Sequence, residues 1–263
     1  MKKYSLLLFL LFSSVQLLSQ ECDDLLNFGY ECPGPLARSA WGIAVKGGVE
    51  PTFWIDPQIS YEFNPLVPPF ISPLNSQGDS FDKHHNTPWM VGSELFYNLN
   101  EQVQLFTEAA YLQASGRTHI ASTAAGINLK ETFHTYRAID SSIGVRKYFA
   151  AWLWGLTPFI GAKLGARYHF QNELNVSLPP LSVGKGACFL QNWCFLTGLQ
   201  LGFECPITAC LHLFISLEGV FTTPLRPKPV MQLALPDGGT AILIGETGSE
   251  ISVPLSLGLR WIF

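Results

Sequence analysis

The sequence predicts an all-β fold, an eight-stranded antiparallel up-and-down transmembrane β-barrel. Apolar residues alternate with small, polar or charged ones in eight segments of about ten residues or more, which is the strand period and the length that crosses a bilayer when tilted. Short connections alternate with long ones between these segments. Only 14% of the 263 residues are charged, whereas a soluble domain carries about a quarter.

The amino terminus has the order of a secretory signal peptide over residues 1–19. Two lysines precede an apolar run over residues 4–12, and small and polar residues follow it. We expect cleavage after residue 19 or 20, then a periplasmic lead-in over 20–38 and the barrel over 39–263. The formal charge of −4 becomes more negative once the leader lysines are removed, which argues against a nucleic-acid partner.

The segment "LTPFIGAKLGARYHF" at 156–170 illustrates the alternation. One face carries residues such as Ile160 and Leu164, which suit hydrocarbon, and the other carries Lys163 and Arg167. One such strand also fits a secreted β-sandwich, whose apolar face packs on a second layer, but eight of them favour the barrel. The expected strands cover residues 40–54, 89–99, 103–114, 131–148, 156–170, 194–204, 211–222 and the carboxyl-terminal segment from 249.

The connections fall into two classes, which is the layout of an outer-membrane barrel with both termini on the periplasmic, short-turn side. The short connections are 99–102, 150–155 and 205–210, and the long ones are 55–88, 115–130, 171–193 and 223–248. Aromatic residues are expected to form girdles at the two membrane interfaces. They are Trp41, Tyr148, Trp152, Trp154 and Trp261 near one rim, and Trp54 and Trp89 near the other.

The last segment, "SVPLSLGLRWIF", is expected to close the barrel against the first strand, with its apolar face toward lipid. Its ending on Trp261 and Phe263 resembles the signal by which barrel-assembly machinery recognises bacterial outer-membrane barrels. The layout of the whole mature chain resembles the small eight-stranded family that includes the OmpA membrane domain, OmpX and the opacity proteins. That resemblance implies a location in the outer membrane of a Gram-negative cell envelope, contact with its lipid and lipopolysaccharide, and a plugged lumen.

The inward-facing positions carry nearly balanced charges. An isolated charge in the lumen would be costly, so these residues are expected to pair as a structural plug; the alternative is a gated channel or a proton path. The expected lumen charges are five bases, Lys46, Arg146, Lys163, Arg167 and Arg260, and six acids, Glu50, Glu94, Glu108, Asp140, Glu204 and Glu218. For Lys163 and Arg167 the candidate partners are Glu94, Glu108 and Glu218.

Six cysteines in an exported chain suggest disulfides. They fall into three close pairs, and local pairing is the simplest expectation, although spacing does not prove connectivity. The pairs are Cys22 with Cys32, Cys188 with Cys194, and Cys205 with Cys210.

The first long connection holds "SFDKHHN", whose Ser80, Asp82, His84 and His85 are residue types that activate nucleophiles or bind metals. Their spacing matches no known signature, and a proline-rich surface loop is the simpler interpretation. We therefore predict no enzymatic activity, cofactor or metal. The expected function is a surface-exposed barrel whose loops serve envelope integrity, adhesion or binding of a ligand or host. The alternatives are a narrow porin-like channel for small solutes and, less favoured, a lipid A-modifying enzyme.

Overall fold

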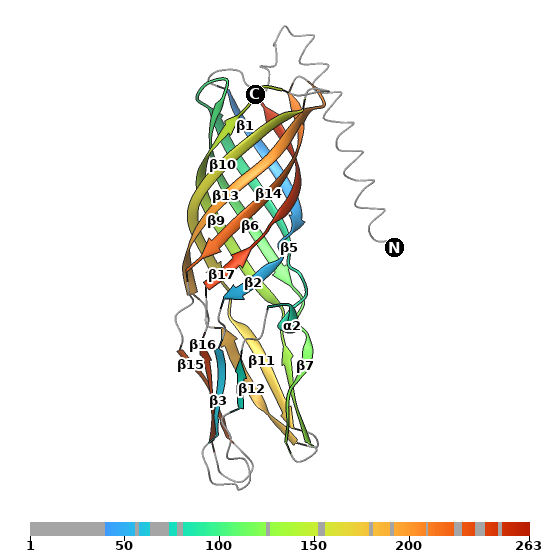
Figure 1. Cartoon of the computed structure of the whole chain (residues 1–263), viewed down its shortest axis with the longest axis vertical. Helices are drawn as coiled ribbons and strands as arrows, with labels where there is room; N and C mark the ends of the chain where they lie inside the picture. The colour runs from blue at the N-terminus through green and yellow to red at the C-terminus, as the bar shows by residue number, and fades with distance from the viewer. Residues whose placement is uncertain are drawn as a thin grey trace, which may run out of the picture.

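Eight antiparallel strands close a barrel in the computed structural model (Figure 1). They are β1 (Trp41–Val49), β5 (Trp89–Asn98), β6 (Val103–Ala114), β9 (Tyr136–Tyr148), β10 (Thr157–His169), β13 (Asn192–Pro206), β14 (Leu211–Thr222) and β18 (Leu255–Ile262). The structure describes residues 40–55, 58–63, 74–77, 81–124, 127–151, 156–178, 181–189, 192–208, 210–223, 228–234, 240–246 and 249–263.

Each strand pairs with its neighbour in the chain order of the barrel, and β1 pairs with β18 to close the ring. The closing register places Gly42 opposite Ile262 and Val49 opposite Leu255. At the end of this ladder, the Phe263 amide donates to the Trp41 carbonyl at 2.9 Å. Closure leaves no unpaired sheet edge, which is the condition for a β-structure in hydrocarbon.

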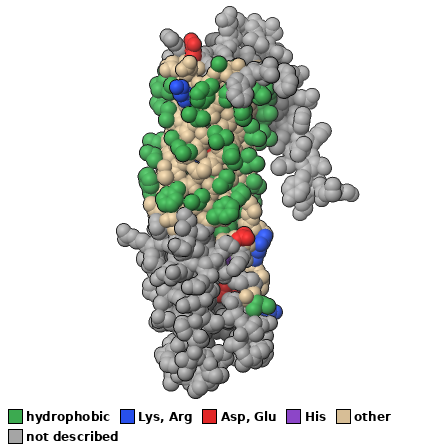
Figure 2. All heavy atoms as spheres, viewed as in Figure 1, with side chains coloured by type: hydrophobic (Ala, Val, Ile, Leu, Met, Phe, Trp, Pro, Cys, Tyr) green, Lys and Arg blue, Asp and Glu red, His purple; other side chains and the backbone are tan. Residues whose placement is uncertain are grey.

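Two faces alternate along the barrel strands, an apolar one outside and an inner one that carries the charged side chains. In β1, for example, Ile43 and Val45 are about half exposed while Lys46 is buried. Figure 2 shows apolar side chains spread over the face of the described barrel wall that is turned toward the viewer. An apolar exterior around a charged interior is the arrangement that a bilayer, and not water, stabilises.

Both strands of the closing pair, β1 and β18, end near a proline at the barrel end opposite the C-terminus. Pro51 separates β1 from β2 (Thr52–Ile55), and Pro254 lies between β17 (Ser249–Ser252) and β18. A proline has no N–H for the ladder, so strands break or bulge there. The breaks face each other, because the Val253 amide donates to the Pro51 carbonyl at 2.8 Å and pairing resumes between β2 and β17.

The long connections are strand hairpins and not irregular loops. They form two further four-stranded sheets, in the orders β7-β8-β11-β12 and β15-β16-β3-β4. The strands are β3 (Gln58–Phe63), β4 (Leu74–Gln77), β7 (Thr118–Ala124), β8 (Ile127–Phe133), β11 (Asn172–Leu178), β12 (Leu181–Phe189), β15 (Lys228–Ala234) and β16 (Thr240–Glu246).

These eight strands, which we call the extension, lie beyond the barrel on the side opposite the C-terminus (Figure 1). We name the two ends of the barrel accordingly, the terminal end and the loop end. The extension repeats the strand order of the barrel wall, since each of its strands continues a barrel strand. It is therefore the barrel wall prolonged and divided into two sheets, which lie next to each other along β12 and β15.

A single helical turn, α2 (Phe81–His84), lies at the loop end next to β2 and β7. Its Phe81 packs with Met90, Leu112 and Tyr136 in a buried apolar cluster. Within the described ranges, no helix is long and apolar enough to cross a membrane.

Two expectations about strands and girdles need correction. The strand expected over 131–148 is divided, because β8 ends at Phe133 and belongs to the extension, while β9 begins at Tyr136. Tyr148 does not stand in an interfacial girdle. Its side chain is buried in the lumen, on the same face of β9 as Arg146, where the phenol has charged partners. Trp152 and Trp154 lie outside the described residues, and so does the side chain of Trp54.

The expected local disulfides are wrong at two of the three pairs. Cys194 and Cys205 are free thiols, so neither Cys188–Cys194 nor Cys205–Cys210 forms. Cys210 is disulfide-bonded, and Cys205 is not its partner. Proximity in sequence misled here because residues 205 and 210 flank a tight turn between two paired strands, where the ladder and not a crosslink holds the chain. The pair Cys22–Cys32 lies outside the described residues.

Candidate functional site

The lumen holds the largest concentration of chemically active side chains in the described part of the chain. The structure buries all eleven expected lumen charges inside the barrel, and Glu250 joins them. They are arranged in three layers along the barrel, which we name the terminal-end layer, the middle layer and the loop-end layer.

The middle layer is a closed ring of two lysines and two glutamates. Lys46 Nζ lies 2.9 Å from both Glu108 Oε2 and Glu218 Oε1. Lys163 Nζ lies 3.2 Å from Glu108 Oε1 and 2.5 Å from Glu218 Oε2. The four residues come from β1, β6, β10 and β14, which are every second strand around the barrel. Charges of opposite sign therefore alternate around the ring, and the ring is neutral.

The terminal-end layer uses the other four strands. Arg146 on β9 binds Glu94 on β5 with both terminal nitrogens, and Arg260 on β18 pairs with Glu204 on β13. The Tyr148 hydroxyl donates to Glu204 Oε2 at 3.0 Å. This layer too has two positive groups, Arg146 and Arg260, and two negative groups, Glu94 and Glu204. In addition, His212 Nδ1 lies 2.8 Å from Glu204 Oε1.

A glutamine connects these two layers. Arg146 Nε donates to Gln200 Oε1 at 2.6 Å, and Gln200 Nε2 donates to Glu218 Oε1 at 3.0 Å. The amide thus has one hydrogen bond to each layer. Gln200 therefore joins Arg146 of the terminal-end layer and Glu218 of the middle layer in one hydrogen-bonded network. Bonds within such a network strengthen one another in a buried site.

The loop-end layer surrounds one guanidinium with three carboxylates. Arg167 binds Asp140 through Nε at 2.7 Å and Nη2 at 2.8 Å, Glu50 at 2.5 Å and Glu250 at 3.3 Å. The sequence suggested Glu94, Glu108 and Glu218 as partners of both Lys163 and Arg167. Lys163 does pair with Glu108 and Glu218, so the prediction was correct for Lys163. None of the three pairs with Arg167, so it was wrong for Arg167. Glu250 was missed, although continuing the alternation of the last strand back through Pro254 would have placed it inside.

Phenylalanines pack beside the charged layers, and no role was predicted for them. Four of them, each directly opposite a glycine on the neighbouring strand, form the pairs Phe96–Gly42, Phe106–Gly144, Phe159–Gly202 and Phe214–Gly258. The rings occupy the space where a glycine Cβ would lie. The guanidinium of Arg146 lies 3.9 Å from the centroid of Phe106, and that of Arg260 lies 4.7 Å from the centroid of Phe214. Ring faces contribute favourably to a desolvated cation.

The charged side chains of these layers are buried. Arg146 and Arg260 are 0% exposed and Glu218 is 1% exposed, so water does not reach their surfaces. A water-filled pore lined by the same residues would leave them accessible. Eight strands enclose an interior that side chains can fill, and here they fill it with paired charges.

The α2 turn lies at the loop end next to β2 and β7, and we call it the cap together with His85. His85 stacks on Phe81 with ring centroids 5.0 Å apart, and His84 lies against Phe133 at 4.3 Å. Asn172 Nδ2 lies 2.8 Å from His85 Nε2. Burial, and then the neighbouring His84, lower the pKa of His85 to about 3, so its imidazole is neutral at physiological pH.

The described residues of the "SFDKHHN" segment have different environments. Both histidines are buried among aromatic rings, whereas Asp82 is exposed, and Ser80 lies outside the described residues. Among the residues that the structure describes, no group of three or more His, Cys, Asp or Glu side chains is placed to hold a metal ion.

Comparison with known proteins adds a fold-level similarity. No family model and no curated protein matches the chain. Among solved structures, Neisserial surface protein A matches with a TM-score of 0.39 and 11% identity, over 85% of this chain and 97% of that one. Ail of Yersinia pestis, solved with the heparin analogue sucrose octasulfate, matches with a TM-score of 0.41 and 10% identity, over 86% and 99%. OprG of Pseudomonas aeruginosa matches with a TM-score of 0.43 and 9% identity, over 84% and 97%.

Similarity at this level says nothing about activity. The chain's own geometry is more informative, since it combines a closed ladder, an apolar exterior and a lumen filled with paired charges. By these features the chain is a closed, eight-stranded antiparallel transmembrane β-barrel.

Proposed function

We propose that the protein is a closed, non-enzymatic anchor that presents its extension at the cell surface for adhesion, envelope integrity or binding of an external ligand. The observation that carries this proposal is the sealed lumen. The neutral middle layer and the terminal-end layer lie one behind the other across the barrel, and their side chains are inaccessible to water. A barrel closed in this way supports what is attached to it.

The extension supports a role in display. A long irregular loop would lose conformational entropy on meeting a partner, whereas paired strands have lost it already. Here each long connection is a hairpin held in a four-stranded sheet, and each sheet continues the rigid barrel wall. We therefore assign ligand contacts to the extension and a supporting role to the lumen.

The orientation follows from the same architecture. Outer-membrane barrels place short turns in the periplasm and long connections outside. The chain has its short turns and its C-terminus at the terminal end and its extension at the other (Figure 1). We propose that both termini are periplasmic and that the extension faces the medium.

Conductance measurements test the closed lumen. Wild-type protein in planar bilayers should show negligible steady conductance. Arg167→Ala, which removes the cation of the loop-end layer, should add at most brief leaks because the two neutral layers remain. Stable, ion-selective steps in the wild type, with a selectivity that Arg167→Glu changes, would contradict the anchor and favour a narrow porin-like channel.

A deletion tests the display role. Replacing the β15–β16 hairpin by a short turn should leave a folded barrel, recognised by its altered gel mobility before heating. The binding measurement is a screen of purified protein against glycan, matrix-protein and lipopolysaccharide arrays, with the same barrel carrying Arg167→Ala as the matched control. Ligands that bind the wild type should be lost with the hairpin and kept by the control. Binding that survives loss of each hairpin in turn would contradict the assignment.

A further inference from the structure

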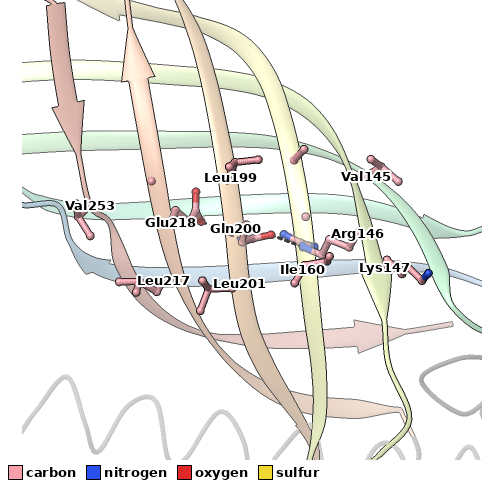
Figure 3. A pocket seen from close by; sticks show the side chains of 13 residues that line it. Val145, Arg146, Lys147, Ile160, Leu199, Gln200, Leu201, Leu217, Glu218 and Val253 are labelled. Carbon is pink, nitrogen blue, oxygen red and sulfur yellow. Dashed lines mark hydrogen bonds between the residues drawn. The ribbon is translucent and has the colours of Figure 1, made fainter.

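The outer face of the barrel carries a groove in the part that faces lipid. Its volume is about 660 Å³, which lies in the range of small-molecule sites. Figure 3 shows its lining side chains spread from Lys147 at one end to Val253 at the other. We call this groove the furrow.

The strand register explains the shape of the furrow. One wall is the row of outward residues that begins at Lys147 and continues through paired positions to Ile160, Leu201 and Leu217. The other wall is the next outward row, Val145, Ala162, Leu199 and Gly219. Between them lies a row of lumen-facing residues, which presents only backbone to the outside. The small side chains of Ala162 and Gly219 keep the second wall low.

The furrow rises from the terminal end toward the middle of the membrane. Lys147 is one residue from the end of β9, and Ile160 is three residues into β10. Leu201 is five residues from the end of β13, and Leu217 is six residues into β14. The three interstrand steps from β9 to β14 cover about 14 Å at the usual strand spacing. Because the strands are tilted by about 40°, these steps rise about 9 Å along the barrel axis, which lies within the roughly 15 Å that one lipid leaflet contributes to the hydrocarbon core.

Lys147 is unusual among its surroundings. Of all the outward-facing positions on the eight barrel strands, only Arg137 and Lys147 are charged, and both are on β9. They are ten residues apart, which on a strand tilted by about 40° separates them by roughly 25 Å, the height of a barrel's apolar band. Each cation therefore stands at one membrane interface, and the furrow begins at Lys147 alone.

We infer that the furrow is a phospholipid site. The Lys147 ammonium pairs with the lipid phosphate at the terminal-end interface, and one acyl chain lies along the furrow past Ile160 and Leu217 to Gly219. A lysine suits a phosphate as a compact positive charge, and an apolar chain fills a groove that offers it no polar side chain but Lys147 at the entrance. The inference rests on insertion of the barrel in a bilayer and is independent of the surface role proposed above.

Native mass spectrometry of the full barrel in mild detergent tests the site. The probes are phosphatidylglycerol, diacylglycerol with the same chains, and lipid A. Wild-type protein should retain one phosphatidylglycerol in preference to the other two. Lys147→Gln should lower that retention about fivefold, the size expected for one cation facing an anionic lipid surface, and Lys147→Arg should restore it. Arg137→Gln, the matched change at the other interface, should have no effect.

A second pair of variants tests the groove itself. A Cβ at Gly219 would meet no atom within 4 Å, so we expect Gly219→Leu to fold and to extend its side chain into the furrow. Gly47→Leu adds the same side chain on the lipid-facing side of β1, where a Cβ has only an ordinary contact at 3.6 Å. Only Gly219→Leu should lose phosphatidylglycerol. Equal retention by both variants, preference for lipid A, or a protein dimer in place of the lipid adduct would overturn the inference.

Discussion

Lys46 on β1 and Lys163 on β10 stand on opposite sides of the barrel and bind the same two carboxylates, those of Glu108 and Glu218. The ring therefore ties four strands of the barrel together through buried ion pairs. Removing one lysine leaves both buried carboxylates with a single cation between them. Removing one lysine and one glutamate keeps the ring neutral.

Lys163→Met should lower the free energy of unfolding by about 3–5 kcal/mol, because the change removes one of the two cations that pair with the buried carboxylates of Glu108 and Glu218. The measurement is urea unfolding of the refolded barrel in lipid vesicles. Lys130→Met, which removes an exposed lysine from β8, should change stability by at most about 1 kcal/mol. The double variant Lys163→Met/Glu108→Gln should recover much of the loss. Equal stability of Lys163→Met and wild type would contradict the structural role of the ring.

Gly144→Ala should destabilise the barrel by about 1–3 kcal/mol through overpacking. A Cβ at this position would collide with the Phe106 ring and lie 2.5 Å from the backbone oxygen of Ala162. Gly47→Ala is the matched control, since its Cβ meets nothing closer than 3.6 Å, and should stay within about 0.5 kcal/mol of wild type. The same unfolding measurement compares them, and indistinguishable variants would show that the Phe–Gly pairs tolerate extra volume.

The cap should loosen as the pH falls below about 6.5. The pKa of His85 is about 3 in the folded cap and near 6.5 in the open one, so the open form binds the proton more tightly between these values. The stability of the cap is therefore complete above pH 6.5 and decreases by about 1.4 kcal/mol for each pH unit below it, until about pH 3. Hydrogen exchange of residues 81–88, corrected for intrinsic rates, measures the opening.

His85→Gln should abolish this pH dependence, since glutamine does not titrate. His134→Gln is the control, because His134 is an exposed histidine of the same region and its loss should leave the wild-type profile. A cap that exchanges equally at pH 5 and pH 7 in the wild type would show that the burial of His85 does not govern its closure.

Assembly should depend on the ring of Phe263. The side chain is 62% exposed on the lipid face of the closing strand, and its amide completes the ladder to Trp41. Phe263→Asp should abolish heat-modifiable, folded barrel in the outer membrane while export to the periplasm continues, and Phe263→Leu should retain most of it. Normal amounts of folded Phe263→Asp protein would refute a role for Trp261 and Phe263 as an assembly signal.

The orientation predicts which insertions are visible on cells. An epitope tag after residue 78, between β4 and α2, should be stained on intact cells, and one after residue 100, in the turn between β5 and β6, should be stained only after permeabilisation. The opposite pattern would place the termini outside.

The sequence by itself determined the barrel. Alternation of apolar and polar residues decides which face of a strand meets lipid, and it does so within each strand, so no distant contact is needed to read it. The same period placed Lys163 and Arg167 inside, and it would have placed Glu250 and Phe106 there had it been followed through every strand.

Tertiary structure alone decided which charges meet. Lys163 is 55 residues from Glu108 along the chain, and their contact depends on strand tilt and stagger, which are properties of the closed ring and not of any segment. The same holds for the extension and the furrow. Pairing between distant hairpins turned expected loops into sheets, and only the register of four strands brings Lys147 into line with Ile160, Leu201 and Leu217.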